Sequence, residues 1–193
     1  MDAETADQMM EATYRALCEH GYADLTMQRI ADESSVSKAT FHYHFDTKEE
    51  LLNAFLDHLL EQFEGRLACE ASDPVERLDT FLDAIFTPAE DADTSPVPMM
   101  ELKSQAPYHE TYRERFVAMD ERLREVVAGA VRDGIESGQF DEADPDEVAR
   151  FVVTAINGAH VREVALGESP AETRRLVEEY LERRLGRRPE VAA

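Results

Sequence analysis

The stretch from Thr26 to Lys48 reads TMQRIADESSVSKATFHYHFDTK and predicts two short helices joined by a tight turn. Thr26 is a good N-cap for the first helix, and Ile30 gives that helix an apolar side. Two consecutive serines interrupt it, and Ser37 is placed to cap a second helix. The pattern therefore indicates a helix-turn-helix unit near the start of the chain.

The second predicted helix has an apolar face and a polar one. Phe41 and Phe45 stand four residues apart and share the face that we expect to be buried. At about 100° per residue, the remaining side chains point outward or lie on the flanks. These outward positions are Lys38, Ala39, Thr40, His42, Tyr43 and His44. A short helix of this kind is typical of one that enters the major groove of DNA.

Lysine usage supports this interpretation. The chain has three lysines, Lys38, Lys48 and Lys103, and two of them bracket the second helix. A lysine at a helix N-terminus opposes the macrodipole, so helix stability does not explain Lys38. Contact with phosphate explains it, since lysines and helix N-termini both bind phosphate oxygens. The alternative is that both lysines are ordinary solvated surface residues.

The net charge of −22 has three competing explanations. The chain does not bind DNA, or it is an acidic adaptor, or its acidity is that of a salt-loving organism's proteome. Residues 1–50 alone carry eleven acidic residues against four Lys and Arg. Scarce lysine and acids spread over the whole chain, with no acidic block, favour adaptation to molar salt. Counterion release then drives DNA binding poorly, and specific contacts must contribute more.

Composition excludes several other classes of protein. The length of 193 residues and an apolar content of 43% suit one domain, or a small domain attached to a larger one. No apolar run is long enough for a membrane span, and the acidic N-terminus is no signal peptide, so we expect a cytoplasmic protein. Cys18 and Cys69 lack metal-site spacing, and we expect both to be buried thiols.

No sequence signature of catalysis or of cofactor binding is present. A nucleophile elbow, a Walker loop, a zinc-ligand spacing and a glycine-rich phosphate loop are all missing from the sequence. His160 and Glu163 are spaced for a shared metal, but a solvated pair is the commoner arrangement. We therefore expect no enzyme, no cofactor and no metal.

Helical periodicity and capping residues predict an all-α protein of about nine helices. Gly21 is expected to end the first helix, and a loop is expected at 87–98. The natural division is a three-helix DNA-binding domain at 1–46 and a helical ligand-binding and dimerisation domain at 47–193. The helices expected outside the motif are 5–20, 47–69, 74–86, 99–104, 108–137, 145–166 and 169–185, followed by a loose tail.

From Gly21 to Leu51 the sequence resembles the tetracycline-repressor (TetR) family of one-component regulators. The shared pattern is GY-x-x-x-T, then IA, then VSKATF, then YHF-x-x-KEEL. The rest of the chain resembles the family in helix count and order. The resemblance implies that the first three helices bind DNA, that the others form a ligand pocket, and that the last two long helices pair with a second subunit.

The same resemblance implies contacts for individual side chains. Gln28 falls where a base-reading residue often lies, and glutamine pairs with adenine through two hydrogen bonds. Ser35 replaces the usual turn glycine, and a left-handed backbone there would be strained. His42 replaces the commoner tyrosine, which predicts tighter operator binding at low pH. The implied DNA-binding residues are Thr26, Gln28, Ser37, Lys38, Ala39, Thr40, His42, Tyr43, His44 and Lys48.

Two further sets of residues are candidates for the ligand pocket and the dimer interface, although both sets also fit a plain core. The candidate pocket residues are aromatic or methionine side chains: Phe81, Phe86, Met99, Met100, Tyr112, Phe116, Met119 and Phe151. The candidate interface residues are small or apolar side chains on the last two helices: Val152, Ala155, Ile156, Ala159, Tyr180 and Leu181. A two-fold dimer predicts a near-palindromic operator.

The sequence therefore predicts a homodimeric, ligand-responsive transcriptional regulator, a repressor of the TetR kind. Ligand is expected to move the helix that begins at Thr47 and so change the separation of the two DNA-reading heads. The rival hypothesis is an acidic protein-interaction adaptor whose helix-turn-helix does not touch DNA.

Overall fold

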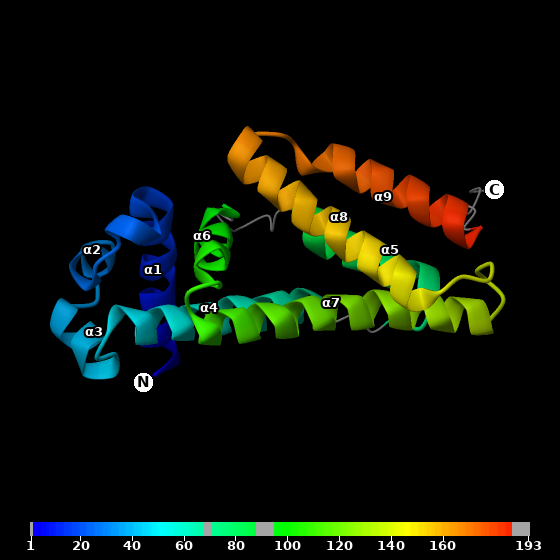
Figure 1. Ribbon diagram of the computed structural model, residues 1–193. Helices are drawn as coiled ribbons and strands as arrows, with labels where there is room; N and C mark the ends of the chain where they lie inside the picture. The colour runs from blue at the N-terminus through cyan, green and yellow to red at the C-terminus, as the bar shows by residue number, and fades with distance from the viewer. Residues whose placement is uncertain (1, 68–70, 88–94, 187–193) are drawn as a thin grey trace. The chain divides into compact units, whose positions relative to one another are not determined.

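The computed structural model describes residues 2–67, 71–87 and 95–186, and within these ranges the chain is all-helical, with nine helices and no strand (Figure 1). The helices are α1 (Ala3–Asp24), α2 (Met27–Asp32), α3 (Lys38–His44), α4 (Lys48–Leu67), α5 (Pro74–Phe86), α6 (Val97–Gln105), α7 (Glu110–Glu136), α8 (Pro145–Leu166) and α9 (Pro170–Leu185). The predicted fold class is confirmed.

The chain divides by packing into two compact units. Unit 1 comprises Met1–Phe63 and Ser95–Val117, and unit 2 comprises Glu64–Thr94 and Ala118–Ala193. Unit 1 therefore contains α6 and parts of α4 and α7 in addition to α1, α2 and α3. This division describes packing; the functional boundary between residues 46 and 47 stays a prediction.

Helix starts follow the capping residues in the sequence. The side chain of Asp73 accepts a hydrogen bond from the backbone N–H of Glu76 at 3.1 Å, and that of Ser169 accepts one from Ala171 at 3.3 Å. A proline follows each of these caps in the first turn, where its missing N–H removes no helical hydrogen bond. These caps explain why the predicted starts of α5 and α9 are confirmed.

Other predicted boundaries differ from the structure. Gly21 interrupts α1 at the predicted position, since its φ of 66° and ψ of 169° are not helical, but helical residues resume after this kink and continue to Asp24. Helix α6 begins at Val97, two residues before the predicted start, because Pro98 fits in its first turn. Three predictions lie wholly or partly outside the described residues. Cys69 lies in 68–70, part of the predicted loop lies in 88–94, and the predicted C-terminal tail lies in 187–193 except for Gly186.

The expectation that Cys18 is a buried thiol is wrong, since this side chain is exposed. The buried stripe of α1 includes Ala12 and Ala16. Cys18 follows Ala16 by two residues, about 200° around the helix, and so points away from that stripe.

Each unit has its own apolar core. In unit 1 the first three helices and α4 share buried side chains that include Leu17, Ile30, Phe41 and Phe55. Burial of one such side chain contributes about 1.5–3 kcal/mol, so this core fixes α2 and α3 on α1 and α4. In unit 2, α8 packs on α9, and α9 also packs on α5. No helix in the described part of the chain has the length and hydropathy to cross a membrane.

Candidate nucleic-acid interface

The helix-turn-helix predicted from residues 26–48 is present as α2 and α3. The Thr26 hydroxyl accepts a hydrogen bond from the Arg29 N–H at 3.2 Å and caps α2. The Ser37 hydroxyl likewise accepts one from the Thr40 N–H at 3.2 Å and caps α3. The Ser37 and Thr40 hydroxyls also share a 2.9 Å hydrogen bond, which orders the first turn of α3. Both predicted caps are therefore confirmed.

Helix α3 is held in place by one phenylalanine where two were expected. Phe41 is fully buried, as predicted. Phe45 is only half-buried, because α3 ends at His44 and Phe45 has extended backbone angles of φ −136° and ψ 118°. The prediction that both rings share one helix face is wrong for Phe45.

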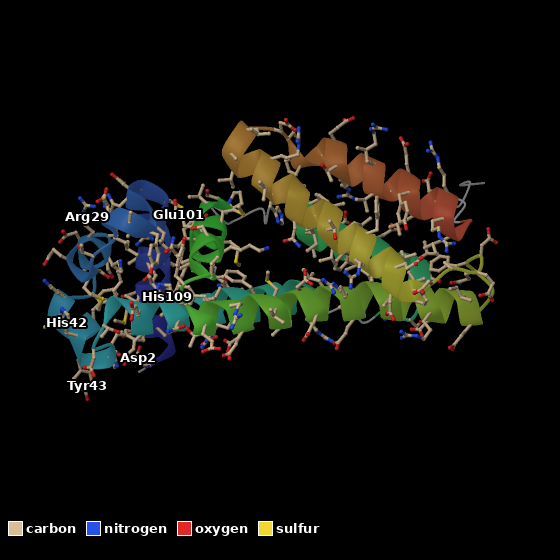
Figure 2. The ribbon with its side chains drawn as sticks, in the orientation of Figure 1. Asp2, Arg29, His42, Tyr43, Glu101 and His109 are labelled. Carbon is tan, nitrogen blue, oxygen red and sulfur yellow. The ribbon has the colours of Figure 1, made fainter. Side chains whose placement is uncertain are left out.

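Most of the side chains nominated for DNA contact face solvent. Figure 2 shows His42 and Tyr43 on the outer side of α3, and Tyr43 is 83% exposed. Thr40, His44 and Lys48 are half-buried. The exposed members of the set are Thr26, Gln28, Ser37, Lys38, Ala39, His42 and Tyr43. These residues together form what we call the reading surface; their role in DNA contact stays a prediction.

The turn needs no left-handed residue. Ser35 stands where glycine is usual, yet no described residue other than glycine has a positive φ. Instead the Ser34 hydroxyl accepts a hydrogen bond from the Val36 N–H at 3.0 Å. A side-chain hydrogen bond of this kind stabilises the turn without the left-handed backbone that glycine would otherwise adopt there.

Both arginines near the reading surface are engaged with helix ends. The Arg29 guanidinium donates to the Asp24 carbonyl at 2.6 Å, and that of Arg15 donates to the Glu33 carbonyl at 2.7 Å. These contacts satisfy carbonyls at the C-termini of α1 and α2, which is a structural use of the two cations.

The two lysines that bracket α3 differ in their surroundings. Lys48 is half-buried, donates to the Leu25 carbonyl at 3.1 Å, and lies 4.7 Å from the centre of the Tyr22 ring. Its contacts favour an anchoring role beside the phosphate contact that the resemblance implies. Lys38 is exposed, and among the residues described no hydrogen bond or ion pair engages its ammonium group. Lys38 is therefore the cation best placed to meet a phosphate.

Carboxylates border the reading surface on the side of α4. An open depression of about 570 Å³ lies beside the end of α3. It is lined by Tyr43, His44, Phe45, Asp46, Glu50, Asn53, Ala54 and Asp57. Asp46, Glu50 and Asp57 contribute carboxylates to this lining, and Asp57 is paired with Arg115. No group of three or more potential metal ligands occurs in the described ranges.

A cluster centred on Tyr22 connects four helices of unit 1, and the sequence did not reveal it. The Tyr22 N–H donates to Oε2 of Glu101 on α6 at 3.2 Å. The Tyr22 hydroxyl lies 3.1 Å from Nε2 of His109, just before α7, and the ring of His109 lies 4.9 Å from that of Tyr112. Lys48 of α4 lies over the Tyr22 ring, so Tyr22 links α1 to α4, to α6 and to His109 beside α7.

Burial affects the two phenols of this cluster. It raises the pKa of Tyr112, and the nearby Tyr22 and Glu49 raise it further. Burial also raises the pKa of Tyr22, with Glu49 adding to the effect. The Tyr112 hydroxyl is buried and no group in the described part of the chain meets it with hydrogen-bond geometry, although the Tyr22 phenol is near enough to affect its pKa.

The nominated pocket residues fall in different units. Phe81, Phe86 and Met119 belong to unit 2, whereas Met99, Met100, Tyr112 and Phe116 belong to unit 1. Four of these are buried (Phe81, Phe86, Tyr112 and Phe116), which fits core packing as well as pocket lining, so their role stays a prediction. Phe151 is 45% exposed and its ring centre lies 3.9 Å from that of Tyr180.

The nominated interface residues also separate by burial. Val152, Ile156, Ala159 and Leu181 are at most 2% exposed within a single protomer, which favours the alternative that they face their own core. Ala155 and Tyr180 are half-buried, and Tyr180 stacks against the exposed ring of Phe151.

Sequence and structure comparisons agree with this site. A family model described as bacterial regulatory proteins of the tetR family matches residues 9–55. A second, described as the C-terminal domain of BetI-type transcriptional repressors, matches residues 74–186. The BetI regulator of Brucella canis is 24% identical over 187 residues, which are 94% of this chain and 92% of that protein.

Solved structures extend the comparison. A TetR transcription regulator from Haloarcula marismortui has a TM-score of 0.89 and 41% identity, covering 95% of this chain and 100% of that one. A transcriptional regulator from Saccharomonospora viridis, solved in complex with choline, has a TM-score of 0.84 at 21% identity, covering 95% of this chain and 98% of that one; it shares the fold. The halophilic source of the first structure supports molar-salt adaptation as the origin of the charge.

Fold and site together define a ligand-responsive, DNA-binding transcriptional regulator with an N-terminal helix-turn-helix. The chain belongs to the TetR family. This is a family of transcriptional regulators, not of enzymes, and the adaptor hypothesis is not favoured.

Proposed function

We propose that this protein is a repressor that binds a near-palindromic operator as a homodimer through the reading surface on α2 and α3. The observation that carries the proposal is the exposure of Lys38 and Tyr43 on a capped α3 whose Phe41 is fully buried. A rigid helix that presents a free cation and an exposed aromatic ring suits contact with phosphates and base edges.

The contacts that give affinity are expected to be few and short-ranged. Lys38 is the available cation, and the hydroxyls of Thr26 and Tyr43 supply neutral phosphate contacts. Gln28 and His42 are the side chains proposed to read base edges. Because few cations take part, operator binding is expected to lose little affinity as salt rises.

The proposed dimer interface is the open side of α8 and α9, which we call the dimer face: Phe151, Ala155, Leu176 and Tyr180. Phe151 and Tyr180 stack, and Leu176 is 51% exposed. Large apolar side chains left exposed on two packed helices favour association with a second copy. Phe151 is thus better assigned to this interface than to the ligand pocket.

The proposed response to ligand is a two-state change in the position of α4 relative to α1, α2 and α3. Tyr22 and Lys48 fix the start of α4 to the end of α1, and Glu101 fixes α6 to the same point. A ligand that favours one arrangement shifts the equilibrium by its differential affinity for the two states. Choline is the first compound to test, because a structural neighbour was solved with it and the C-terminal family model is of the BetI type.

Selection from a randomised duplex library in molar KCl tests the proposal. The expected result is enrichment of a near-palindrome that binds at least tenfold more tightly than a scrambled duplex, a ratio that corresponds to about 1.4 kcal/mol. Failure to enrich any sequence at low or molar salt would refute DNA recognition and revive the adaptor hypothesis.

A further inference from the structure

The carboxamide of Gln28 is held by a carboxylate on its own helix. Nε2 of Gln28 donates to Oδ1 of Asp32 at 2.7 Å, and the two residues lie one turn apart on α2. Both side chains are exposed on α2, one of the two helices that carry the reading surface. Exposed pairs at this spacing add little to stability, so the consequence of the contact lies in the hydrogen-bonding groups that it leaves to Gln28.

A glutamine side chain has two N–H donors and one carbonyl acceptor. In the major groove adenine presents one acceptor and one donor, whereas guanine presents two acceptors. A glutamine with both N–H groups free can therefore pair with adenine through its carbonyl and one N–H, or with guanine through its amino group. The free side chain is ambiguous between the two purines.

The contact with Asp32 removes this ambiguity. A carboxylate only accepts hydrogen bonds, so it holds the amino end of Gln28 and not the carbonyl end. One N–H is then occupied, and the groups that remain are one donor and the carbonyl acceptor. When Asp32 takes the N–H that points away from the carbonyl oxygen, the other N–H and the carbonyl lie side by side; this pair complements adenine and lacks the second donor that guanine requires.

We infer that Asp32 is a positioning residue that restricts Gln28 to adenine, an inference that rests on the proposed base-reading role of Gln28. Asp32 also has a cost, since its charge repels nearby phosphates. The hydrogen bond raises selectivity among bases, whereas the charge lowers affinity for every duplex. Removal of Asp32 should therefore lower selectivity without lowering affinity, which distinguishes a positioning role from a structural one.

The test compares the full-length protein with three variants, Gln28→Ala, Asp32→Ala and Asp32→Asn, all in molar KCl. Selection from a randomised duplex library identifies the operator position at which Gln28→Ala loses its base preference. Fluorescence anisotropy then measures Kd for adenine and for guanine at that position. Asp24→Ala is the charge control, because Asp24 is an exposed carboxylate at the end of α1, whereas the carboxamide of Gln28 donates to Asp32.

The wild-type protein is expected to prefer adenine by roughly tenfold, within the range for one bidentate pair. Asp32→Ala should reduce that ratio to below about threefold while binding all duplexes as tightly as before or more tightly. Asp32→Asn should keep the ratio, because its Oδ1 still accepts from Gln28. Asp24→Ala should keep the ratio as well, and all variants should unfold at the wild-type temperature.

An unchanged ratio in Asp32→Ala, with Gln28→Ala altered, would overturn the inference and leave Gln28 as the reader. A loss of the ratio in Asp32→Asn as large as in Asp32→Ala would also overturn it, because charge would then be responsible. A Gln28→Ala profile identical to the wild type, or no enrichment by the wild type, would refute the proposed base reading and the inference together.

Discussion

The backbone N–H of Tyr22 donates to Oε2 of Glu101, so a carboxylate from α6 holds the point where α1 departs from helical geometry at Gly21. A Cβ added to Gly21 would lie 3.4 Å from Oε1 of the same carboxylate. The kink, the carboxylate and the lysine of α4 thus meet around one tyrosine, which places the coupling of α1, α4 and α6 within a single cluster.

Glu101→Ala is expected to lower the free energy of unfolding by about 1–2 kcal/mol, because the Tyr22 N–H loses its acceptor. Glu101→Gln keeps an acceptor oxygen and should lose less. Urea denaturation in molar KCl measures both, with Glu61→Ala, an exposed carboxylate on α4, as the control. Equal stability of Glu101→Ala and Glu61→Ala would contradict the assigned role of Glu101.

Gly21→Ala and Gly65→Ala should change stability in opposite directions. Gly21 has φ 66° and ψ 169°, a backbone region almost restricted to glycine, so alanine should cost about 1–3 kcal/mol there. Gly65 lies exposed in α4 with open space around its Cβ position, so alanine should stabilise by about 0.5–1 kcal/mol. Thermal unfolding checks the pair; stabilisation by Gly21→Ala would show that the kink is not required.

Lys38→Ala and Lys48→Ala should separate DNA contact from stability. Lys38→Ala is expected to weaken operator binding without changing the unfolding temperature, and to reduce the salt slope by about 1 per lost phosphate contact. Lys48→Ala should lower stability first, because the Leu25 and Tyr22 carbonyls lose their hydrogen bonds to the Lys48 ammonium group. Anisotropy across a KCl series and thermal unfolding of both variants give the comparison. If Lys38→Ala lowered stability and Lys48→Ala weakened only operator binding, Lys48 would be the DNA contact and Lys38 the structural lysine.

Leu176→Glu should dissociate the dimer, since it places a charge within the dimer face. Val117→Glu is the matched control, because Val117 and Leu176 are each 51% exposed but Val117 belongs to unit 1. Light scattering in molar KCl should give one-subunit mass for the first variant and two-subunit mass for the second. A dimer that survives Leu176→Glu would rule out this face as the interface.

Tyr112→Phe should make stability less sensitive to alkaline pH. The pKa of the Tyr112 phenol is raised by burial above its ordinary value of 10.0, so the folded state favours the neutral form. The unfolded chain ionises first as the pH rises past about 10, and the free energy of unfolding falls. Urea denaturation at about pH 8 and about pH 11 should show a smaller fall in the variant. At the lower pH the variant should be at least as stable, because it removes a buried hydroxyl that has no partner.

An identical pH dependence in wild type and Tyr112→Phe would contradict that account. Tyr22 is present in both proteins, but its pKa responds to Tyr112, so the difference between the two pH profiles reports both phenols together.

Local signals in the sequence explain which parts were predicted correctly. The caps Thr26 and Ser37 and the buried Phe41 follow from side-chain chemistry within one turn, and the structure confirms them. The end of α3 was missed, because Phe45 has the helical spacing but lies beyond the last helical residue.

Contacts between distant segments were not predictable from spacing. Glu101 is 79 residues from Tyr22 and His109 is 87 residues away, so no local pattern relates them. The burial of Val152 and the exposure of Phe151 depend on how α8 rests on α9, and one apolar stripe cannot distinguish the protomer core from an interface. The engagement of Lys48 with carbonyls of α1 was missed for the same reason.

Operator binding by the double variant Lys38→Ala/Tyr43→Ala in molar KCl tests most directly whether α3 reads DNA. Both side chains are exposed, so the variant should keep the wild-type unfolding temperature and dimeric mass. Its affinity for the selected duplex should fall by at least tenfold, toward that for a scrambled duplex. Wild-type affinity in a folded, dimeric double variant would show that α3 does not read DNA.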